Sequence, residues 1–401
     1  MTDQELHRPR RSRWKRVAVA VPVTLAVLVG GAYVATTIAD VPPPHQLAKT
    51  ATAKPSEWGE LFDYRTVTAG APRPLTATPV DLPTQVPWKG KQVDLAEFLD
   101  TTHTNSLVVL HDGELVHEWY ADGFDAGTLQ PSFSVAKSVV SLLVGQAIGR
   151  GELSEDDLLV DVLPDLRTGG DYDKITVAHL LDMSAGVDVS EVYNEMWPFT
   201  GTSLMFLTRD LEKFVADRTE VDRTPGEKAD YRSVETMLLG LVLEKATGKN
   251  LSTLLSEGIW TPTGAEADAR WSLDAADTDD RAGVEKAFAG INATARDFAR
   301  VGQLVVDGGE ADGEQVLPAE WIDRISTSAV VMEAYDQGYS AQWWHPWTDR
   351  EDFTAIGIYG QYVYVDPASR TVVVKLSDHG TEQDEDETLD VLRDVAQHVS
   401  R

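Results

Sequence analysis

Residues 133–148 read FSVAKSVVSLLVGQAI, and their apolar side chains are spread over almost the whole circumference of a helix. A helix that is apolar nearly all round is buried inside a domain. Arg150-Gly151 follows, and a glycine just past the last turn commonly ends a helix. Ser134 and Lys137 are three positions apart, so their side chains share one face. The sequence therefore predicts a buried helix with a serine and a lysine together at its N-terminal end.

Ser134 and Lys137 form an S-x-x-K pattern, which is a candidate site for nucleophilic catalysis. An amine beside a hydroxyl can help to remove its proton, and the N-terminus of a helix stabilises developing negative charge. The pattern is short, and Ser12 to Lys15 also fits it. The copy at 134–137 is favoured because Lys137 lies among positions that should otherwise be apolar. The alternative is a lysine at the rim of the helix.

Strands are predicted on both sides of this helix. Residues 107–110 and 115–120 flank an Asp-Gly pair that suits a tight hairpin turn. The order of elements predicts an α/β protein of the α+β type, with an antiparallel sheet flanked by helices and an inserted, mostly helical lobe at about 150–290. The active site is expected in the crevice between the lobes. The other expected elements are helices at 233–247, 293–306 and 385–399 and strands at 360–365 and 371–376.

Three further positions are candidates for chemistry. Tyr231 lies two residues before Ser233, the expected N-cap of a helix. A tyrosine at such a position often has only a packing role. A nearby ammonium, however, would lower the pKa of its phenol and allow it to accept a proton. In the stretch 357–361, GIYGQ, the glycines either mark a bend or let a backbone N–H approach a substrate oxygen, as an oxyanion hole needs. Ser184 resembles half of a nucleophile elbow, but position 182 is Asp, so we expect a structural loop.

The composition excludes several classes of protein. The 401 residues carry 35 basic and 65 acidic side chains, a net charge of −30, which disfavours nucleic-acid binding. Cysteine is absent, which excludes disulfide scaffolds, thiolate zinc sites and iron–sulfur clusters. The nine histidines form no H-x-H or H-E-x-x-H pair, and no glycine-rich phosphate loop is present. We therefore expect neither a metal nor another cofactor, and a small molecule as the partner.

The N-terminal region predicts a membrane segment. Residues 1–16 form a basic tail, and Val17 to Ala39 contains no charged side chain. A helix of that length is ~34 Å long, enough to cross a hydrocarbon core of ~30 Å. The basic flank favours a single-pass cell-membrane protein with its catalytic domain outside the cytoplasm. The alternative is a cleaved signal peptide and secretion. Residues 40–55, rich in proline at their start, are expected to form a stalk before a domain at 56–401.

Together these motifs resemble the serine β-lactamase and penicillin-binding superfamily, which uses S-x-x-K, a Y-x-N/S and a K/H-x-G triad on a strand. The resemblance extends to a class C-like branch that contains 6-aminohexanoate-dimer hydrolase and family VIII carboxylesterases. It covers residues 55–401 and also rests on the segments 151–157 with Leu163-Pro164, 175–186, 294–300 and 342–344.

The resemblance implies a role for each matching residue. Ser134 would be the nucleophile, Lys137 its activating partner and Tyr231 the general acid/base. The backbone N–H groups of Ser134 and Ile358 would form the oxyanion hole. Ser233 would orient Lys137 or the substrate, and Gly357 and Gly360 would position the substrate. The triad aligns with Ala355-Ile356-Gly357, so the cation of the family is missing. This favours a hydrolase of small linear amides or esters over a penicillin-recognising β-lactamase or D-Ala-D-Ala carboxypeptidase. A catalytically silent binding module of the same fold is the remaining alternative.

Overall fold

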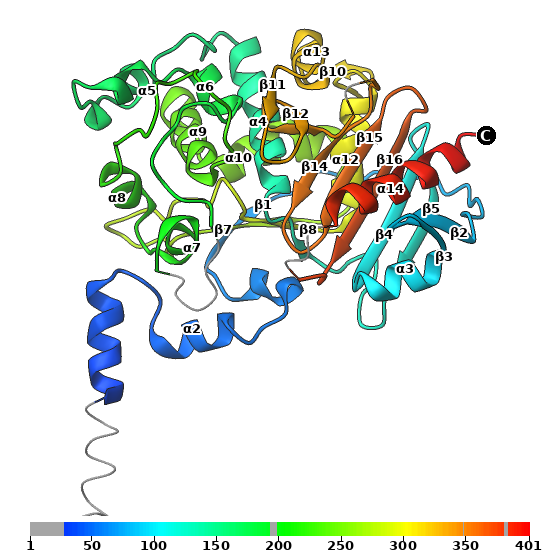
Figure 1. Cartoon of the computed structure of the whole chain (residues 1–401), viewed down its shortest axis with the longest axis horizontal. Coiled ribbons are helices and arrows are strands. Elements are labelled where there is room, and N and C mark those ends of the chain that lie inside the picture. The colour runs from blue at the N-terminus through cyan, green and yellow to red at the C-terminus, as the bar shows by residue number, and fades with distance from the viewer. Residues whose placement is uncertain (1–27, 193–198, 348, 381–383) are drawn as a thin grey trace, which may run out of the picture.

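The computed structural model describes residues 28–192, 199–347, 349–380 and 384–401. Its centre is an eight-stranded antiparallel sheet with the order β11-β12-β13-β14-β15-β16-β4-β5. The predicted hairpin forms β4 and β5, and β4 pairs with β16, so early and late parts of the chain share one sheet (Figure 1). The strands are β4 (Thr104–His111), β5 (Glu114–Tyr120), β11 (Val330–Met332), β12 (Gln337–Ser340), β13 (Trp343–His345), β14 (Phe353–Gly357), β15 (Gln361–Asp366) and β16 (Thr371–Ser377).

Helices cover both faces of this sheet. Successive side chains of a strand point to opposite faces, and here apolar side chains on both faces are buried. Val108 and Leu110 pack in one core cluster with α4 (Val135–Gly149) and α12 (Ala295–Val306). Leu107 and Val109 point the other way, into a cluster with α3 (Leu95–Thr101) and α14 (Glu385–Val399). The helix expected from residues 133–148 is therefore α4, buried along almost its whole length.

The inserted lobe lies beside the sheet and is mostly helical, as predicted (Figure 1). Its longest helix, α9 (Ser233–Thr247), ends at Gly248 in the left-handed conformation, with a φ of 69°. The antiparallel sheet with its helical insert confirms the predicted fold class. The lobe contains α5 (Leu159–Val162), α6 (Val177–Leu181), α7 (Gly201–Leu207), α8 (Leu211–Ala216), α9, α10 (Leu251–Leu255) and α11 (Thr261–Thr263), and α13 (Ala319–Ser326) lies nearer the sheet.

Several short strands were not predicted. A second sheet has the order β1-β7-β8-β6, made of β1 (Tyr64–Val67), β7 (Ala269–Ser272), β8 (Ile291–Ala293) and β6 (Gln130–Pro131). Two small hairpins join β2 (Gln85–Trp88) to β3 (Lys91–Asp94) and β9 (Glu310–Ala311) to β10 (Glu314–Gln315). Strands of two to four residues carry too little alternation to be recognised in a sequence.

The prediction of a membrane-spanning segment is wrong. Among the residues that the structure describes, no helix is long and apolar enough to cross a membrane. In the described part of the predicted span, residues 28–38 are helical. The localisation inferred from that span, a single-pass cell-membrane protein, is therefore wrong as well. Residues 1–16 and 17–27 lie outside the described residues.

The segment expected to be a stalk contains a short helix, α2 (Pro44–Thr50), in which proline occupies the first turn. Proline is tolerated there because the first N–H groups of a helix have no partner within it. The backbone N–H of Arg209 donates to the carbonyl of Asp40 at 2.8 Å, and Val41 is buried. The next turn, η1 (Pro55–Glu60), lies along the base of the molecule between the lobe and the sheet (Figure 1).

Candidate active site

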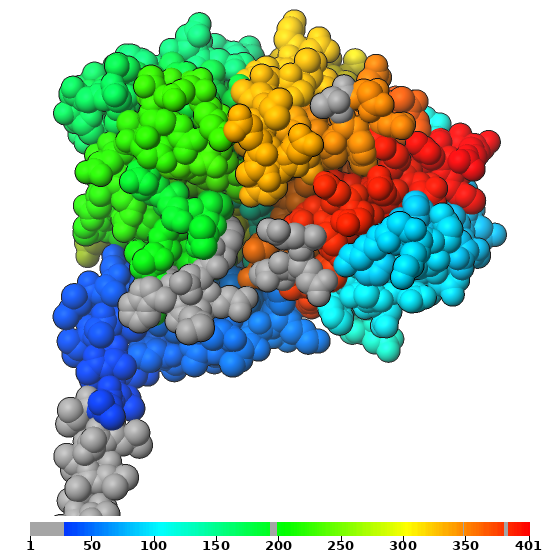
Figure 2. Space-filling view, viewed as in Figure 1, coloured from blue at the N-terminus to red at the C-terminus, as the bar shows by residue number. Residues whose placement is uncertain are grey.

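A cavity of about 1210 Å³ lies where the helical lobe meets the sheet, and Figure 2 shows a hollow between the green lobe, the orange part of the chain and the red helix α14. This is the crevice in which the sequence predicted the site. Its lining comes from the start of α4 at Ser134, two segments of the lobe, the strands β12 to β15 with their turns, and the first residues of α14.

Ser134 and Lys137 meet as the S-x-x-K spacing predicts. Ser134 occupies the N-cap position of α4 without a side-chain capping hydrogen bond, and the Nζ of Lys137 donates to its Oγ at 2.7 Å. The same Nζ donates to the backbone carbonyl of Phe288 at 3.1 Å. Two partners on different segments fix the amine, and its hydrogen bond to Ser134 places it in reach of the hydroxyl proton.

The amine of Lys137 is held in an environment that disfavours its charge. Lys137 is 1% exposed, and burial lowers its pKa from 10.5 to about 8, while the carboxylate of Glu191 acts in the opposite direction. Desolvation penalises an ammonium more than a neutral amine. A substantial fraction of Lys137 is therefore uncharged near pH 8 and able to accept a proton.

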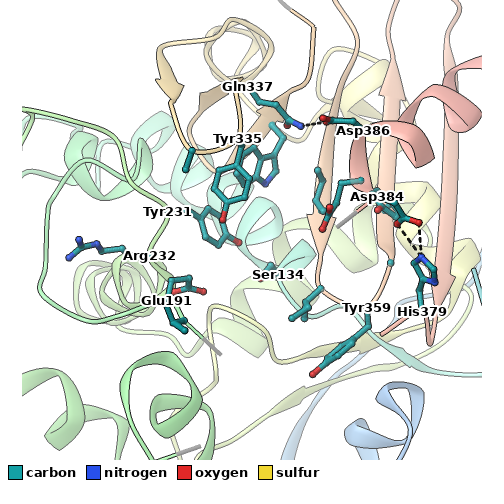
Figure 3. A pocket seen from close by; sticks show the side chains of 18 of the residues that line it. Ser134, Glu191, Tyr231, Arg232, Tyr335, Gln337, Tyr359, His379, Asp384 and Asp386 are labelled. Carbon is teal, nitrogen blue, oxygen red and sulfur yellow. Dashed lines mark hydrogen bonds and ion pairs between the residues drawn. The ribbon is translucent and has the colours of Figure 1, made fainter. Parts of the chain in front are cut away.

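Tyr231 lies beside this pair at the floor of the cavity (Figure 3). The Nζ of Lys137 is 4.9 Å from the centre of the Tyr231 ring. On its other side the ring packs against Trp344, with centroids 5.3 Å apart, and against Tyr335 at 6.5 Å. The structure therefore brings Ser134, Lys137 and Tyr231 together.

The pKa of Tyr231 moves in the direction opposite to the one expected. Burial raises it well above 10, the nearby carboxylate of Glu191 raises it further, and a hydrogen bond with Ser134 offsets only part of the increase. The neighbouring ammonium was expected to dominate, but removal of the phenol from water has the larger effect. Near neutral pH, Tyr231 is a protonated phenol.

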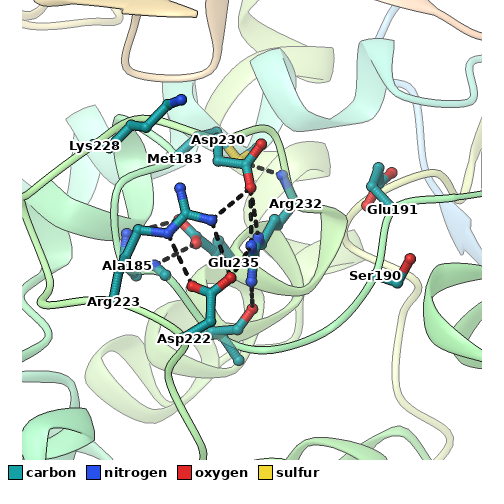
Figure 4. Close-up of polar contacts among 12 residues, drawn as sticks. Met183, Ala185, Ser190, Glu191, Asp222, Arg223, Lys228, Asp230, Arg232 and Glu235 are labelled. Atoms are coloured by element: carbon teal, nitrogen blue, oxygen red, sulfur yellow. Dashed lines mark hydrogen bonds and ion pairs between the residues drawn. The ribbon is translucent and has the colours of Figure 1, made fainter. Parts of the chain in front are cut away.

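A loop of the lobe fixes the backbone around Tyr231 (Figure 4). The N–H groups of its two neighbours bond to Met183: Asp230 to the carbonyl at 2.7 Å and Arg232 to Sδ at 3.4 Å. The N–H groups of Ala185 and Gly186 in turn donate to the buried carboxyl of Glu235 at 3.1 and 3.0 Å. Burial raises the pKa of Glu235 to about 8. Sequence reasoning missed Glu235, because one acid within an apolar helix carries no distinguishing pattern.

The end of β14 runs next to the start of α4. A Cβ added to Gly357 would lie 2.5 Å from the carbonyl oxygen of Ser132, so only glycine allows this approach. The turn that follows contains Tyr359 and Gly360 at φ values of 69° and 82°. Ser134, Ile358 and Gly360 line the same cavity, whereas Gly357 faces Ser132. The oxyanion hole formed by the N–H groups of Ser134 and Ile358 stays a prediction.

Ser233 has a different partner from the one expected. Its hydroxyl and its N–H donate to Glu191 at 2.6 and 2.8 Å, and the hydroxyl of Thr202 donates to the same carboxylate at 2.7 Å. Arg232 takes the N-cap position of α9 that was expected for Ser233. Ser233 is fully buried behind the cavity wall, so its role in positioning substrate stays a prediction. Glu191 also lines the cavity. The sequence did not predict this role, because a single acidic residue in a loop forms no recognisable motif.

The charged groups of the cavity are mainly acidic (Figure 3). The two basic side chains in its described lining are Arg232, which donates to Asp222 and Asp230, and His379, which contacts Asp384 at 2.9 Å. The acidic side chains at the start of α14 lie at this cavity. The acidic lining residues are Asp188, Glu191, Asp230, Asp384, Glu385, Asp386 and Glu387. In the described part of the chain, no group of three or more acidic or histidine side chains is arranged to hold a metal ion.

Comparison with known proteins identifies the family. The model of the beta-lactamase family matches residues 95–397. The chain belongs to the beta-lactamase family. The 6-aminohexanoate-dimer hydrolase of Paenarthrobacter ureafaciens is 31% identical over 345 residues, covering 80% of this chain and 83% of that protein. The predicted resemblance to the serine β-lactamase and penicillin-binding superfamily is confirmed.

Solved structures agree with this assignment. A structure from Bacillus anthracis, provisionally named a 6-aminohexanoate-dimer hydrolase, has a TM-score of 0.77 at 25% identity and covers 86% of this chain and 93% of that one. A family VIII carboxylesterase shares the fold, with a TM-score of 0.60 at 18% identity over 75% of this chain and 94% of that one. The chain is thus a beta-lactamase-family protein similar to a 6-aminohexanoate-dimer hydrolase, and it shares the fold of a family VIII carboxylesterase.

Two other sequence candidates can be placed in this beta-lactamase-family fold. Ala355, which aligns with the missing cation, is 1% exposed and packs in the core cluster of α4, whereas its neighbour Ile356 lines the cavity. A lysine at position 355 would therefore have to be buried. Ser184 donates to the carbonyl of His179 at 3.3 Å and is not part of the cavity lining, as expected for a structural loop.

Proposed function

We propose that this protein is a serine hydrolase that cleaves amide or ester bonds of small substrates through an acyl-enzyme on Ser134. The observation that carries the proposal is the 2.7 Å contact between Ser134 and a fully buried Lys137 at the edge of a cavity of about 1210 Å³. A lysine removed from water, with a pKa of about 8, is suited to activate a hydroxyl near neutral pH.

Acylation begins when the neutral amine of Lys137 takes the proton of Ser134 as its Oγ attacks the carbonyl carbon. The carbonyl oxygen becomes an oxyanion, which the N–H groups of Ser134 and Ile358 would stabilise. Tyr231 is the candidate proton donor to the leaving amine or alkoxide, because its phenol is protonated and hydrogen-bonds with Ser134. Lys137 then returns a proton to Tyr231. Water attacks the acyl-enzyme in the second half-reaction, and Ser134 leaves with its proton restored.

The acidic lining supports a substrate without a free carboxylate near the reacting bond. Seven acidic residues line the cavity, and the basic side chains in its described lining, Arg232 and His379, already contact carboxylates. An anionic β-lactam would meet repulsion from these carboxylates. Neutral esters, and linear amides that carry an ammonium group, fit the lining better. The curated relative is named for 6-aminohexanoate dimer, which makes that linear amide a suitable first substrate.

A fluorophosphonate probe tests the proposal because it labels an activated serine covalently. We expect labelling of Ser134, turnover of short p-nitrophenyl esters or 6-aminohexanoate dimer, and weak turnover of nitrocefin. A nitrocefin rate above that for the neutral ester would favour the penicillin-recognising alternative. A folded protein with neither labelling nor turnover would favour a silent binding module.

A further inference from the structure

We propose that Trp58 is a positioning residue for the catalytic site, holding the two backbone segments that would form the oxyanion hole. The inference rests on the proposed function, because it assigns a purpose to the N–H groups of Ser134 and Ile358. Trp58 lies on η1, in a part of the chain outside the residues 95–397 that match the family. The N-terminal segment thereby becomes part of the catalytic unit.

Both segments contain a bulky residue in a conformation that bulky residues seldom adopt. Phe133, directly before Ser134, has a φ of 43°, and Tyr359, directly after Ile358, has a φ of 69°. Left-handed backbone places the Cβ of a residue other than glycine close to its own carbonyl group. Such positions persist only where the surrounding structure holds them. The N–H of Ser134 belongs to the peptide unit directly after Phe133, so its direction depends on the conformation of Phe133. Ile358 lies directly before Tyr359, so the conformation of Tyr359 fixes the path of the turn that holds Ile358.

The rings of the two strained residues contact each other, and Trp58 contacts both. The centroids of Phe133 and Tyr359 are 4.9 Å apart in an edge-to-face arrangement. Trp58 lies 5.8 Å from Phe133 and 5.9 Å from Tyr359, each with an interplanar angle of 62°. These separations are typical of favourable aromatic pairs. Trp58 thus closes a cluster of three rings that joins the start of α4 to the turn after β14.

The turn that carries Trp58 is itself fixed to the domain. Ser56 donates its N–H and its hydroxyl to the carboxylate of Asp378 at 2.7 and 2.8 Å. The adjacent residue, His379, donates its N–H to the carbonyl of Tyr359 at 3.1 Å. On the other side, a Cβ on Gly59 would lie 2.1 Å from Oδ1 of Asn292, which shows how closely η1 approaches β8. The indole is therefore presented on a rigid support.

A second path leads from Trp58 to Lys137. The indole lies 5.3 Å from the ring of Phe206, which in turn lies 6.2 Å from that of Phe288. The carbonyl of Phe288 accepts a hydrogen bond from the amine of Lys137. Trp58 therefore contacts Phe133 and Tyr359 directly, and it reaches Phe288, whose carbonyl binds the amine of Lys137, through Phe206. A displacement of about 1 Å at such a site can lower the rate by about 100-fold.

The experiment compares Trp58→Leu, Trp58→Phe and a control, Trp88→Leu. Trp88 also belongs to the N-terminal region and packs against Phe98, but on the opposite face of the sheet. In both tryptophans the indole N–H is buried without a hydrogen-bond partner among the described residues, so phenylalanine removes no hydrogen bond. The readouts are kcat and KM for a p-nitrophenyl ester, and hydrogen–deuterium exchange of peptides covering 132–137 and 357–361.

We expect Trp58→Leu to lower kcat at least about tenfold with KM changed by less than about twofold, and to speed exchange in both peptides. Trp58→Phe should stay within about threefold of the wild-type kcat, and Trp88→Leu should behave as the wild type in both readouts. Normal kcat and normal exchange in Trp58→Leu would overturn the inference, as would equal losses in Trp88→Leu or no rescue by Trp58→Phe. A wild type without labelling or turnover would refute the proposed function instead, and the exchange data would still test the role of Trp58.

Discussion

Replacing Lys137 by methionine should abolish turnover and at the same time stabilise the protein at neutral pH. Methionine has a similar length and no charge, so it can occupy the same buried channel. Lys286 offers a matched control, since it is also fully buried and has its pKa lowered by burial from 10.5 to about 8. Its Nζ lies over the rings of Phe62 and Phe206, has no hydrogen-bond partner among the described residues, and is not in the cavity lining.

The magnitude follows from the depressed pKa values. A fall from 10.5 to about 8 means that the folded state disfavours the ammonium by about 3 kcal/mol. Because the folded pKa is the lower one, this cost is fully present below pH 8, decreases between pH 8 and 10.5, and is absent above pH 10.5. Lys286→Met should therefore gain about 3 kcal/mol at pH 7. Lys137→Met should gain about 1–2 kcal/mol, since it also loses hydrogen bonds to Ser134 and Phe288 worth ~1 kcal/mol each.

Urea unfolding of the wild type and both variants at pH 7 and pH 9 measures these differences, and ester hydrolysis is assayed on the same samples. The gain of Lys286→Met should shrink to about 2 kcal/mol at pH 9. We expect Lys137→Met to lose at least about 100-fold in kcat/KM, and Lys286→Met to keep wild-type turnover within a few-fold. A Lys137→Met variant that is active, or one that is less stable at pH 7 with no dependence on pH, would refute the reasoning.

Three further predictions concern the reaction itself. The rate of acylation should rise about tenfold per pH unit up to about pH 8 and then level off, since only the neutral amine of Lys137 accepts a proton; a flat profile from pH 6 to 9 would exclude this role. Tyr231→Phe should lower kcat by ~10²–10⁴-fold with an unchanged melting temperature, and an active variant would leave Tyr231 as packing only. The kcat/KM for a neutral p-nitrophenyl ester should exceed that for nitrocefin by at least about tenfold, and the ratio should decrease as salt rises from 0.05 to 0.5 M; a preference for nitrocefin would contradict the acidic lining.

The parts of the fold that were predictable are those with long, regular patterns. Periodicity and turn residues agreed at three places in the chain. These are the mostly apolar helix α4, the helix α9 that ends at Gly248, and the hairpin of β4 and β5. The S-x-x-K spacing placed Ser134 and Lys137 in contact because one helical turn separates them. Once a helix is recognised, its geometry alone determines that two side chains three positions apart lie close together.

The remaining features depend on contacts between distant segments. Glu191 reaches Ser233 across the lobe, and Trp58 reaches Tyr359 across most of the chain, so neither leaves a local signal in the sequence. The raised pKa of Tyr231 depends on burial, which a motif does not report. The uncharged stretch at 17–39 predicted a span from hydropathy alone, but no helix among the described residues is long and apolar enough to cross a membrane.

Covalent labelling by a fluorophosphonate, followed by mass spectrometry of the labelled peptide, tests the nucleophile directly. The wild type should carry one adduct on Ser134, with Ser134→Ala folded, unlabelled and inactive, because the change removes one oxygen at a helix start. Ser184→Ala is the matched control, since Ser184 lies outside the cavity lining and donates to the carbonyl of His179. It should be labelled on Ser134 at the wild-type rate. An adduct on Ser184, or turnover that persists in Ser134→Ala, would contradict the assignment of Ser134 as the nucleophile.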